Sequence, residues 1–118
     1  MIEKIDIAQK ADAITEYWRP ETVATLNGQD VKLARFKGEF VWHHHQNEDE
    51  LFLGVKGHFR VEFRDHVVHI HPGELIVVPR GIEHRTVAEE EAVAILFEPA
   101  GVRNTGNVFH PTLTAPGR

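Results

Sequence analysis

Three histidines and one glutamate in this sequence have the side-chain types and the spacing of a metal site. His43 and His45 form an His-x-His pair, Glu50 follows five positions later, and His84 comes after a Pro-Arg-Gly turn. Imidazole nitrogens and carboxylate oxygens are the donors that divalent first-row metals take in proteins. The chain has no cysteine, so nitrogen and oxygen must hold the ion, which favours Zn, Mn, Fe, Ni or Co.

A second His-x-His pair, His69 and His71, tests whether the first pair is more than chance. With nine histidines in 118 residues, roughly one such pair is expected from composition alone. His69 and His71 run into the turn dipeptide Pro72-Gly73, with no carboxylate at hairpin distance. We interpret this second pair as solvated positions at the end of a strand.

The segment that leads into the first pair favours a strand. Aromatic and β-branched residues precede His43, and side chains two apart on a strand point to the same face. His43 and His45 can therefore face one ion, while His44 should point outward with Trp42. We expect Trp42 and Phe40 to lie on the outer face, against the core or a second subunit.

Glu50 opens the apolar run 51–56, and the short polar segment 46–48 suits a hairpin loop. Such a hairpin would return Glu50 to the side of the two histidines. A carboxylate at the start of an apolar strand points inward in this reading and needs a partner.

Three charged residues lie close to His84 in sequence. Arg80 and Arg85 flank it and could pair with an anionic substrate, although we favour solvation at the surface. Glu83 is near enough to orient a histidine ligand, but nothing in the sequence directs it inward.

Composition limits the kinds of protein this chain can be. A chain of 118 residues with 42% hydrophobic and 26% charged residues supports a single globular domain, 1–118, with its own core. The net charge of −5 provides no basic field for nucleic acid. No apolar stretch reaches the roughly twenty residues that span a bilayer, and the first residues do not resemble a signal peptide, so we expect a cytoplasmic protein.

The pattern along the chain predicts an all-β domain with a short N-terminal helix. The helix is expected within 8–16, in a helical or extended segment 1–22, with Asp6 and Asp12 as caps. Asn27-Gly28 between two strand-like runs predicts a type I′ hairpin. Short strands with turns every eight to twelve residues favour a sandwich or barrel over 23–99. We expect separate strands at 82–88 and 93–97 around Glu89-Glu90-Glu91, and an extended tail, 100–118, that wraps a neighbour.

Two longer patterns contain the four candidate ligands. They are Gly38-x4-His43-x-His45-x4-Glu50-x6-Gly57 and Gly73-x5-Pro79-x-Gly81-x2-His84. Together they resemble the two motifs of the cupin superfamily, in particular its small single-domain, mannose-6-phosphate-isomerase-like members. The first glycine-to-histidine gap is one residue shorter than the usual form, and Ala88 replaces an asparagine that often ends the second motif. The resemblance implies a double-stranded β-helix, or jelly-roll, barrel with His43, His45, Glu50 and His84 as ligands of one divalent metal ion.

A metal site with open positions predicts chemistry on a small ligand inside the barrel. On this resemblance we expect an oxygenase or isomerase for a small oxygen-rich molecule, such as a sugar, an organic acid or a dicarbonyl. Two alternatives stay open: a non-catalytic sensor that binds a small ligand, and an interaction module whose metal is structural. Apolar outward residues further predict a homodimer.

Overall fold

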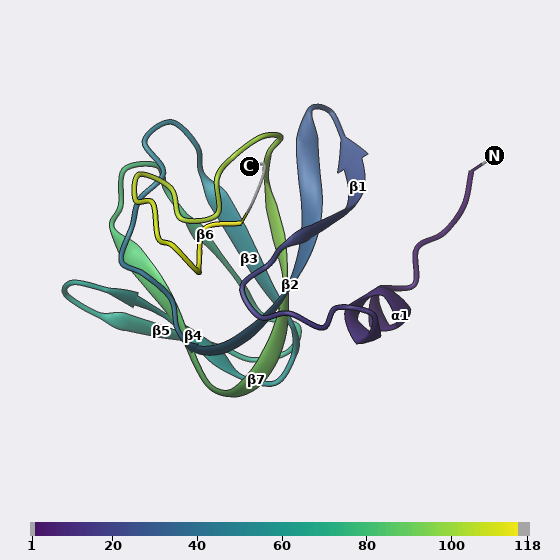
Figure 1. The fold of residues 1–118 in the computed structure, drawn as a ribbon, viewed down its shortest axis with the longest axis horizontal. Helices are drawn as coiled ribbons and strands as arrows, with labels where there is room; N and C mark the ends of the chain where they lie inside the picture. The colour runs from purple at the N-terminus through teal and green to yellow at the C-terminus, as the bar shows by residue number, and fades with distance from the viewer. Residues whose placement is uncertain (1, 116–118) are drawn as a thin grey trace.

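Seven strands and one short helix make up the computed structural model, which describes residues 2–115 (Figure 1). Their bounds are α1 (Ile7–Asp12), β1 (Glu21–Leu26), β2 (Gln29–Glu39), β3 (Glu50–Lys56), β4 (Phe59–Phe63), β5 (Val67–Ile70), β6 (Leu75–Val78) and β7 (His84–Pro99). The strands run in the order β1-β2-β7-β3-β6, and β4 joins β7 to β5. The all-β fold with a short N-terminal helix is thus confirmed. No helix among these residues has the length and apolarity needed to cross a bilayer.

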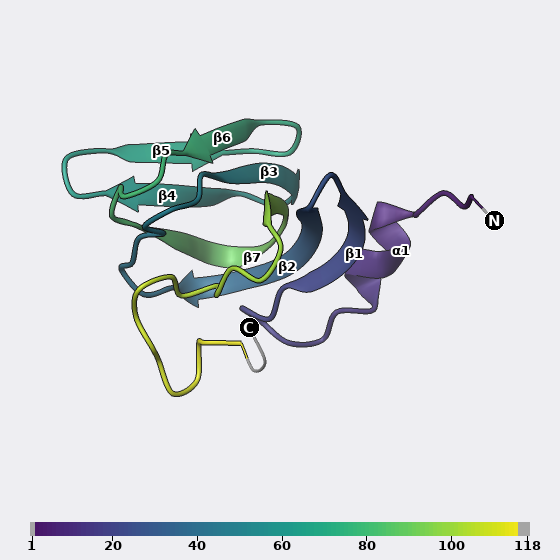
Figure 2. The same cartoon turned by 90° about the horizontal axis from the view of Figure 1, so that it is seen from above.

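The N-terminal helix covers part of the outer face of the barrel, beside β1 and β2 (Figure 2). It begins after Asp6, whose side chain accepts a hydrogen bond from the backbone N–H of Gln9 at 3.1 Å. This bond satisfies one of the free donors at the helix N-terminus. Ala11 packs with the buried Leu33 and Val93 beneath it. The helix therefore closes one face of the sheet and leaves the barrel interior open.

The predicted hairpin at Asn27-Gly28 is present. Both residues have positive φ, 52° for Asn27 and 74° for Gly28, and Leu26 pairs with Gln29 across the turn. A type I′ turn requires this left-handed conformation at both central positions, and asparagine and glycine adopt it at low cost.

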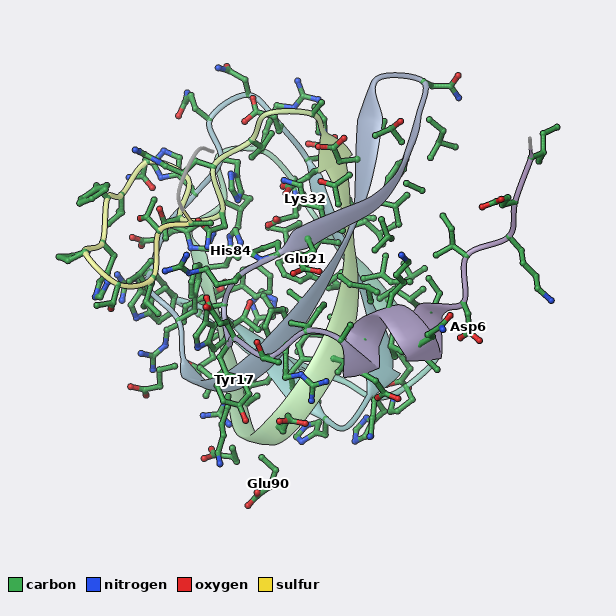
Figure 3. The ribbon with its side chains drawn as sticks, turned by 45° about the vertical axis from the view of Figure 1, so that its right-hand side comes forward. Asp6, Tyr17, Glu21, Lys32, His84 and Glu90 are labelled. Carbon is green, nitrogen blue, oxygen red and sulfur yellow. The ribbon has the colours of Figure 1, made fainter. Side chains whose placement is uncertain are left out.

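The expected strands 82–88 and 93–97 are one continuous strand, β7. Its first part pairs with β4 and its last part with β3, while β2 pairs along both. The register against β2 shifts between Phe36 and Gly38, opposite the three acidic residues. They lie exposed on this irregular stretch, and Figure 3 shows Glu90 directed away from the barrel. A bulge lets a strand bend from one layer into the next without ending, which the sequence pattern did not reveal.

The interior between the layers is aromatic. Phe59 and Val61 are fully buried, and Trp18 lies between Phe36 and Phe40 with ring centroids 4.7 and 4.8 Å away. The prediction that Phe40 faces outward is wrong: its ring lies in the core with Phe36, on the inward phase of β2. Phe40 is therefore not available for a subunit contact, and the homodimer stays a prediction.

The C-terminal segment also differs from the expectation. Residues 100–115 pack on the barrel of their own chain, where Asn104 donates hydrogen bonds to the carbonyl oxygens of Trp18 and Leu113. The rest of the predicted tail, 116–118, lies outside the described residues.

Candidate metal centre

The four predicted ligand residues meet inside the barrel. Each is buried, with at most 4% of its surface exposed, and one ligand atom from each lies within 4.8 Å of the others. Among the described residues, this is the group of four histidine and carboxylate side chains whose geometry could hold a metal ion. The members are His43, His45, Glu50 and His84.

The chain brings these residues together by a route that differs from the predicted hairpin. Residues 40–45 follow the end of β2, and His43 forms an isolated bridge with His84, with both backbone N–H···O distances at 2.9 Å. Glu50 starts β3, which pairs with β6 and β7 and not with residues 40–45. The backbone carbonyl of His45 accepts a bond from the N–H of Gly81 at 2.8 Å. The ligand loop 43–45 is therefore fixed against the start of β7.

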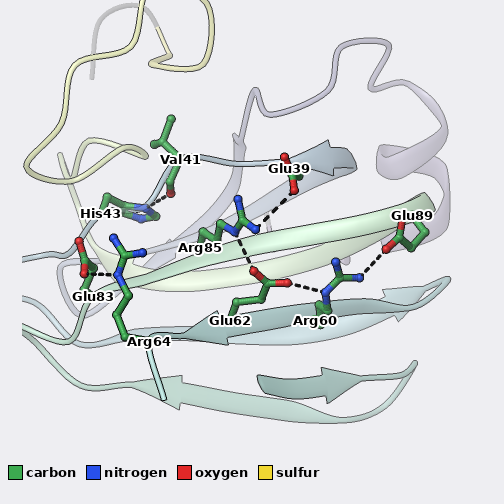
Figure 4. A network of polar contacts seen from close by, with 9 residues as sticks. All are labelled: Glu39, Val41, His43, Arg60, Glu62, Arg64, Glu83, Arg85 and Glu89. Atoms are coloured by element: carbon green, nitrogen blue, oxygen red, sulfur yellow. Dashed lines mark hydrogen bonds and ion pairs between the residues drawn. The ribbon is translucent and has the colours of Figure 1, made fainter. Parts of the chain in front are cut away.

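Backbone carbonyl groups set the orientation of two imidazole rings. The Nδ1–H of His43 donates to the carbonyl of Val41 at 2.9 Å (Figure 4), and the Nδ1–H of His84 donates to the carbonyl of Ile82 at the same distance. With Nδ1 as the donor, the lone pair of each neutral ring is on Nε2. This arrangement fixes the tautomers and leaves Nε2 of each ring available as a ligand atom, as similar bonds do in known metal sites.

Three polar atoms of the group have no hydrogen-bond partner although they are buried. They are Nε2 of His45, Nε2 of His84 and Oε1 of Glu50. The Glu50 oxygen lies 3.3 Å from the His45 nitrogen and 3.5 Å from that of His84. Buried polar atoms are normally paired, because leaving one unpaired costs about 1–3 kcal/mol. A divalent cation between these atoms would satisfy all three at once, so the residues fit such an ion.

Electrostatics favour the metal-binding protonation state of His43 and of Glu50. Burial, together with repulsion from His84, lowers the pKa of His43 to about 4, so its ring is neutral at physiological pH. Burial on its own would raise the pKa of Glu50, but polar contacts with His45 and His84 outweigh it and hold that pKa well below its usual range. Neutral imidazoles and an ionised carboxylate are the forms that coordinate metals.

A buried contact between a lysine and a glutamate next to the group was missed in the sequence. The Lys32 ammonium lies 3.1 Å from Oε1 of Glu98, and both side chains are 2% exposed. Figure 3 shows Lys32 inside the barrel. Burial, and then the charge of Glu50, raise the pKa of Glu98 to about 9. The available signal was strand phase, because Glu98 lies two residues after the buried Leu96 and therefore on the inward face of β7.

An internal cavity of about 30 Å³ adjoins the group. His43, Glu50 and Glu98 contribute its polar wall, with Thr86 and Asn104, and the remaining wall is mainly aromatic and aliphatic: Trp18, Pro20, Phe36, Phe40, Phe52 and Leu96. A cavity of this size holds about two water molecules. Its mainly apolar wall lowers the local polarity, which strengthens electrostatic interactions with groups bound there.

Other residues considered from the sequence lie outside the group. Arg80 pairs with Asp49 at the surface. Arg85 pairs with Glu62 and Glu39 (Figure 4). Glu83 accepts a bond from Arg64 at 2.7 Å and does not orient His84.

Three ring-bearing side chains considered from the sequence, Trp42, His69 and His71, also lie outside the candidate metal centre. Trp42 is half-buried beneath the guanidinium of Arg64, at 3.8 Å from its ring centre. His69 and His71 are exposed and contact His58, away from the site.

A jelly-roll barrel with a buried group of three histidines and a glutamate defines a class of small proteins that could bind a metal in their interior. The family model described as a cupin domain matches residues 31–98, and the chain belongs to this family.

Known proteins similar to the chain include two whose names state no activity and one enzyme. A solved cupin-2 domain protein from Shewanella frigidimarina shares 36% identity, with a TM-score of 0.79 over 80% of this chain and 93% of its own. An uncharacterised protein, YdbB of Bacillus subtilis, is 30% identical over 75% of this chain and 79% of its length. The acireductone dioxygenase of Bacillus licheniformis is 32% identical over 63% of this chain, which spans 44% of that enzyme.

Proposed function

We propose that the protein is a metal-dependent oxygenase that acts on a small oxygen-rich molecule, with one divalent ion bound by His43, His45, Glu50 and His84. The observation that carries this proposal is the convergence of four buried donor side chains with unpaired ligand atoms. A bound ion of this kind would supply Lewis acidity and open coordination positions for oxygen-bearing ligands. The similarity to an acireductone dioxygenase favours oxygenation over isomerisation.

The residues around the group serve such a reaction by positioning and by excluding water. The carbonyl groups of Val41 and Ile82 orient two imidazoles, so little reorganisation is needed when an ion binds. The aromatic wall of Trp18, Phe36 and Phe40 shields one side of the site from solvent. Water exclusion protects reactive intermediates from side reactions.

Metal binding is tested by loading the protein anaerobically with Fe(II), Mn(II) or Zn(II), followed by dialysis and elemental analysis. We expect about one ion per chain in the wild type and at least a tenfold weaker affinity in His45→Ala, because outer and inner ligand changes cost at least that much. His69→Ala is the matched control, since it removes an exposed histidine outside the group. Equal metal content in His45→Ala and the wild type would contradict the proposal.

The oxygenase role is tested separately from metal binding. Oxygen consumption by the Fe(II)-loaded protein is measured with a panel of small enediols and hydroxy acids, with the His45→Ala protein as background. Water bound to the Mn(II)-loaded protein is counted by proton relaxation, because a structural ion is usually closed off by protein ligands. A site without exchangeable water and without oxygen uptake would support the interaction-module alternative.

A further inference from the structure

A second hollow lies on the outer side of the ligand loop and shares one residue, His45, with the candidate metal centre. It is a groove of about 200 Å³ between the ligand loop and the C-terminal segment, lined by His44, His45, Gln46, Glu48, Val102, Arg103, Gly106 and Asn107. His45 belongs both to this groove and to the candidate metal centre. The groove therefore has room for a small organic molecule next to one of the proposed ligands, whereas the internal cavity does not.

Hydrogen bonds fix the two walls of the groove to each other. The backbone N–H of His44 donates to Oδ1 of Asn107 at 2.9 Å, and the backbone N–H of Asn107 donates to the carbonyl of His44 at 3.1 Å. Gly106 lies directly against the His44 carbonyl, so closely that a side chain there would collide with it. Residues on the C-terminal wall thus keep a defined position relative to His45.

Arg103 is the arginine of this groove, and it differs from the other described arginines in having no carboxylate partner. Its Nε–H donates to the carbonyl of Gly106 at 2.9 Å, and the side chain is half-buried. Among the described arginines it alone forms no ion pair with a carboxylate; the pairs of the others are Arg19–Glu16, Arg35–Glu91, Arg60–Glu62, Arg64–Glu83, Arg80–Asp49 and Arg85–Glu62. A guanidinium held through Nε offers its terminal nitrogens as a fork for a carboxylate or phosphate.

We propose that the groove is the substrate site and that Arg103 binds an anionic group, a carboxylate or a phosphate, of a small substrate whose other end reaches the metal centre beside His45. The inference rests on the proposed metal-dependent function, and it narrows the substrate to a singly anionic class. Glu48 also lines the groove, and its negative charge disfavours a second anionic group at that side.

The test measures binding of small probes to the Zn(II)-loaded and the metal-free protein by NMR titration. The probes are lactate, methyl phosphate and lactamide, the uncharged analogue of lactate. We expect an anion to bind the wild type at least about tenfold more tightly than it binds Arg103→Gln, because hydrogen bonds to a charged group contribute about 1.5–3 kcal/mol. Arg19→Gln is the control, since that arginine has a carboxylate partner and lies outside the groove.

The outcomes separate this inference from the proposed function. A preference for lactate over methyl phosphate identifies a carboxylate substrate, and the reverse preference identifies a phosphate. Equal anion affinity in Arg103→Gln and the wild type overturns the inference, and so does failure of both anions to bind the wild type. Retention of metal by His45→Ala refutes the metal centre instead, whatever the probe titrations give.

Discussion

Replacing Gly106 by alanine should weaken metal binding although this residue is not a ligand. A Cβ atom there would meet the carbonyl oxygen of His44, and it would lie 2.9 Å from the His44 carbonyl carbon and 3.0 Å from Cδ2 of His43. Carbon atoms in contact need about 3.5 Å or more, so the ligand loop must move by at least about 0.5 Å. Overpacking of this size costs about 1–3 kcal/mol, and displaced ligand geometry costs about 10–100-fold in metal affinity.

Gly101→Ala provides a matched control for this change. Gly101 has a φ of +85° and Gly106 a φ of +56°, so alanine is conformationally strained at both, but nothing lies within 4 Å of a Cβ at Gly101. The difference between the two variants therefore isolates the steric contact. We expect Gly106→Ala to melt about 4–12 °C below Gly101→Ala, taking about 4 °C per kcal/mol for a domain of this size. Metal affinity is measured by competition with a chromophoric chelator. Equal melting temperatures and equal affinities in the two variants would refute the steric argument.

Three further perturbations probe the barrel. Glu98→Met should destabilise the protein by about 3–5 kcal/mol, since it removes the carboxyl partner of the buried Lys32 ammonium and leaves only the Val102 carbonyl at 3.5 Å, and the double variant with Lys32→Met should recover most of this loss in urea unfolding; a double variant as unstable as the single one contradicts the charge argument. His43 has a folded pKa of about 4 against 6.5 for the free side chain, so the unfolded state binds more protons between these values. The buried neutral His43 ring therefore costs no folding stability above pH 6.5. The free energy of unfolding falls by about 3 kcal/mol as the pH drops to 4, at 1.36 kcal/mol per pKa unit. The metal-free His43→Gln protein should lack this part of the acid destabilisation, and identical pH profiles would count against it. Asp6→Ala should cost about 1 kcal/mol through the lost helix cap, measured by thermal unfolding, and no change would show that the cap bond is too solvent-exposed to matter.

The sequence was sufficient to predict which side chains gather in the barrel. The spacing of His43, His45, Glu50 and His84 predicted one group, and the structure brings these four together. Alternation also placed His44 outside the group correctly, although residues 40–45 are not part of a named strand. The reason is that an extended backbone turns successive side chains to opposite sides whether or not it is paired in a ladder.

The pairing of the strands and the positions where strands bulge or change phase could not be predicted in this way. Nothing in the apolar run after Glu50 indicates that β3 pairs with β6 and β7, because pairing depends on contacts distant in sequence. The bulge opposite Glu89-Glu90-Glu91 keeps a strand continuous through residues that look like a loop. Phe40 lies inward with Ala34 and Phe36, so the alternation changes phase between Phe40 and His43, which the sequence does not mark.

The bonds between His44 and Asn107 join residues 63 positions apart in the chain. During synthesis, the ligand loop and β7 leave the ribosome before the segment that completes the wall beside them. A nascent chain that ends before Arg103 already contains all four candidate ligands but neither the groove nor its arginine. The residues of the candidate metal centre and those of the C-terminal wall of the groove therefore come from separable parts of the chain, and a truncation before Arg103 would remove only the second.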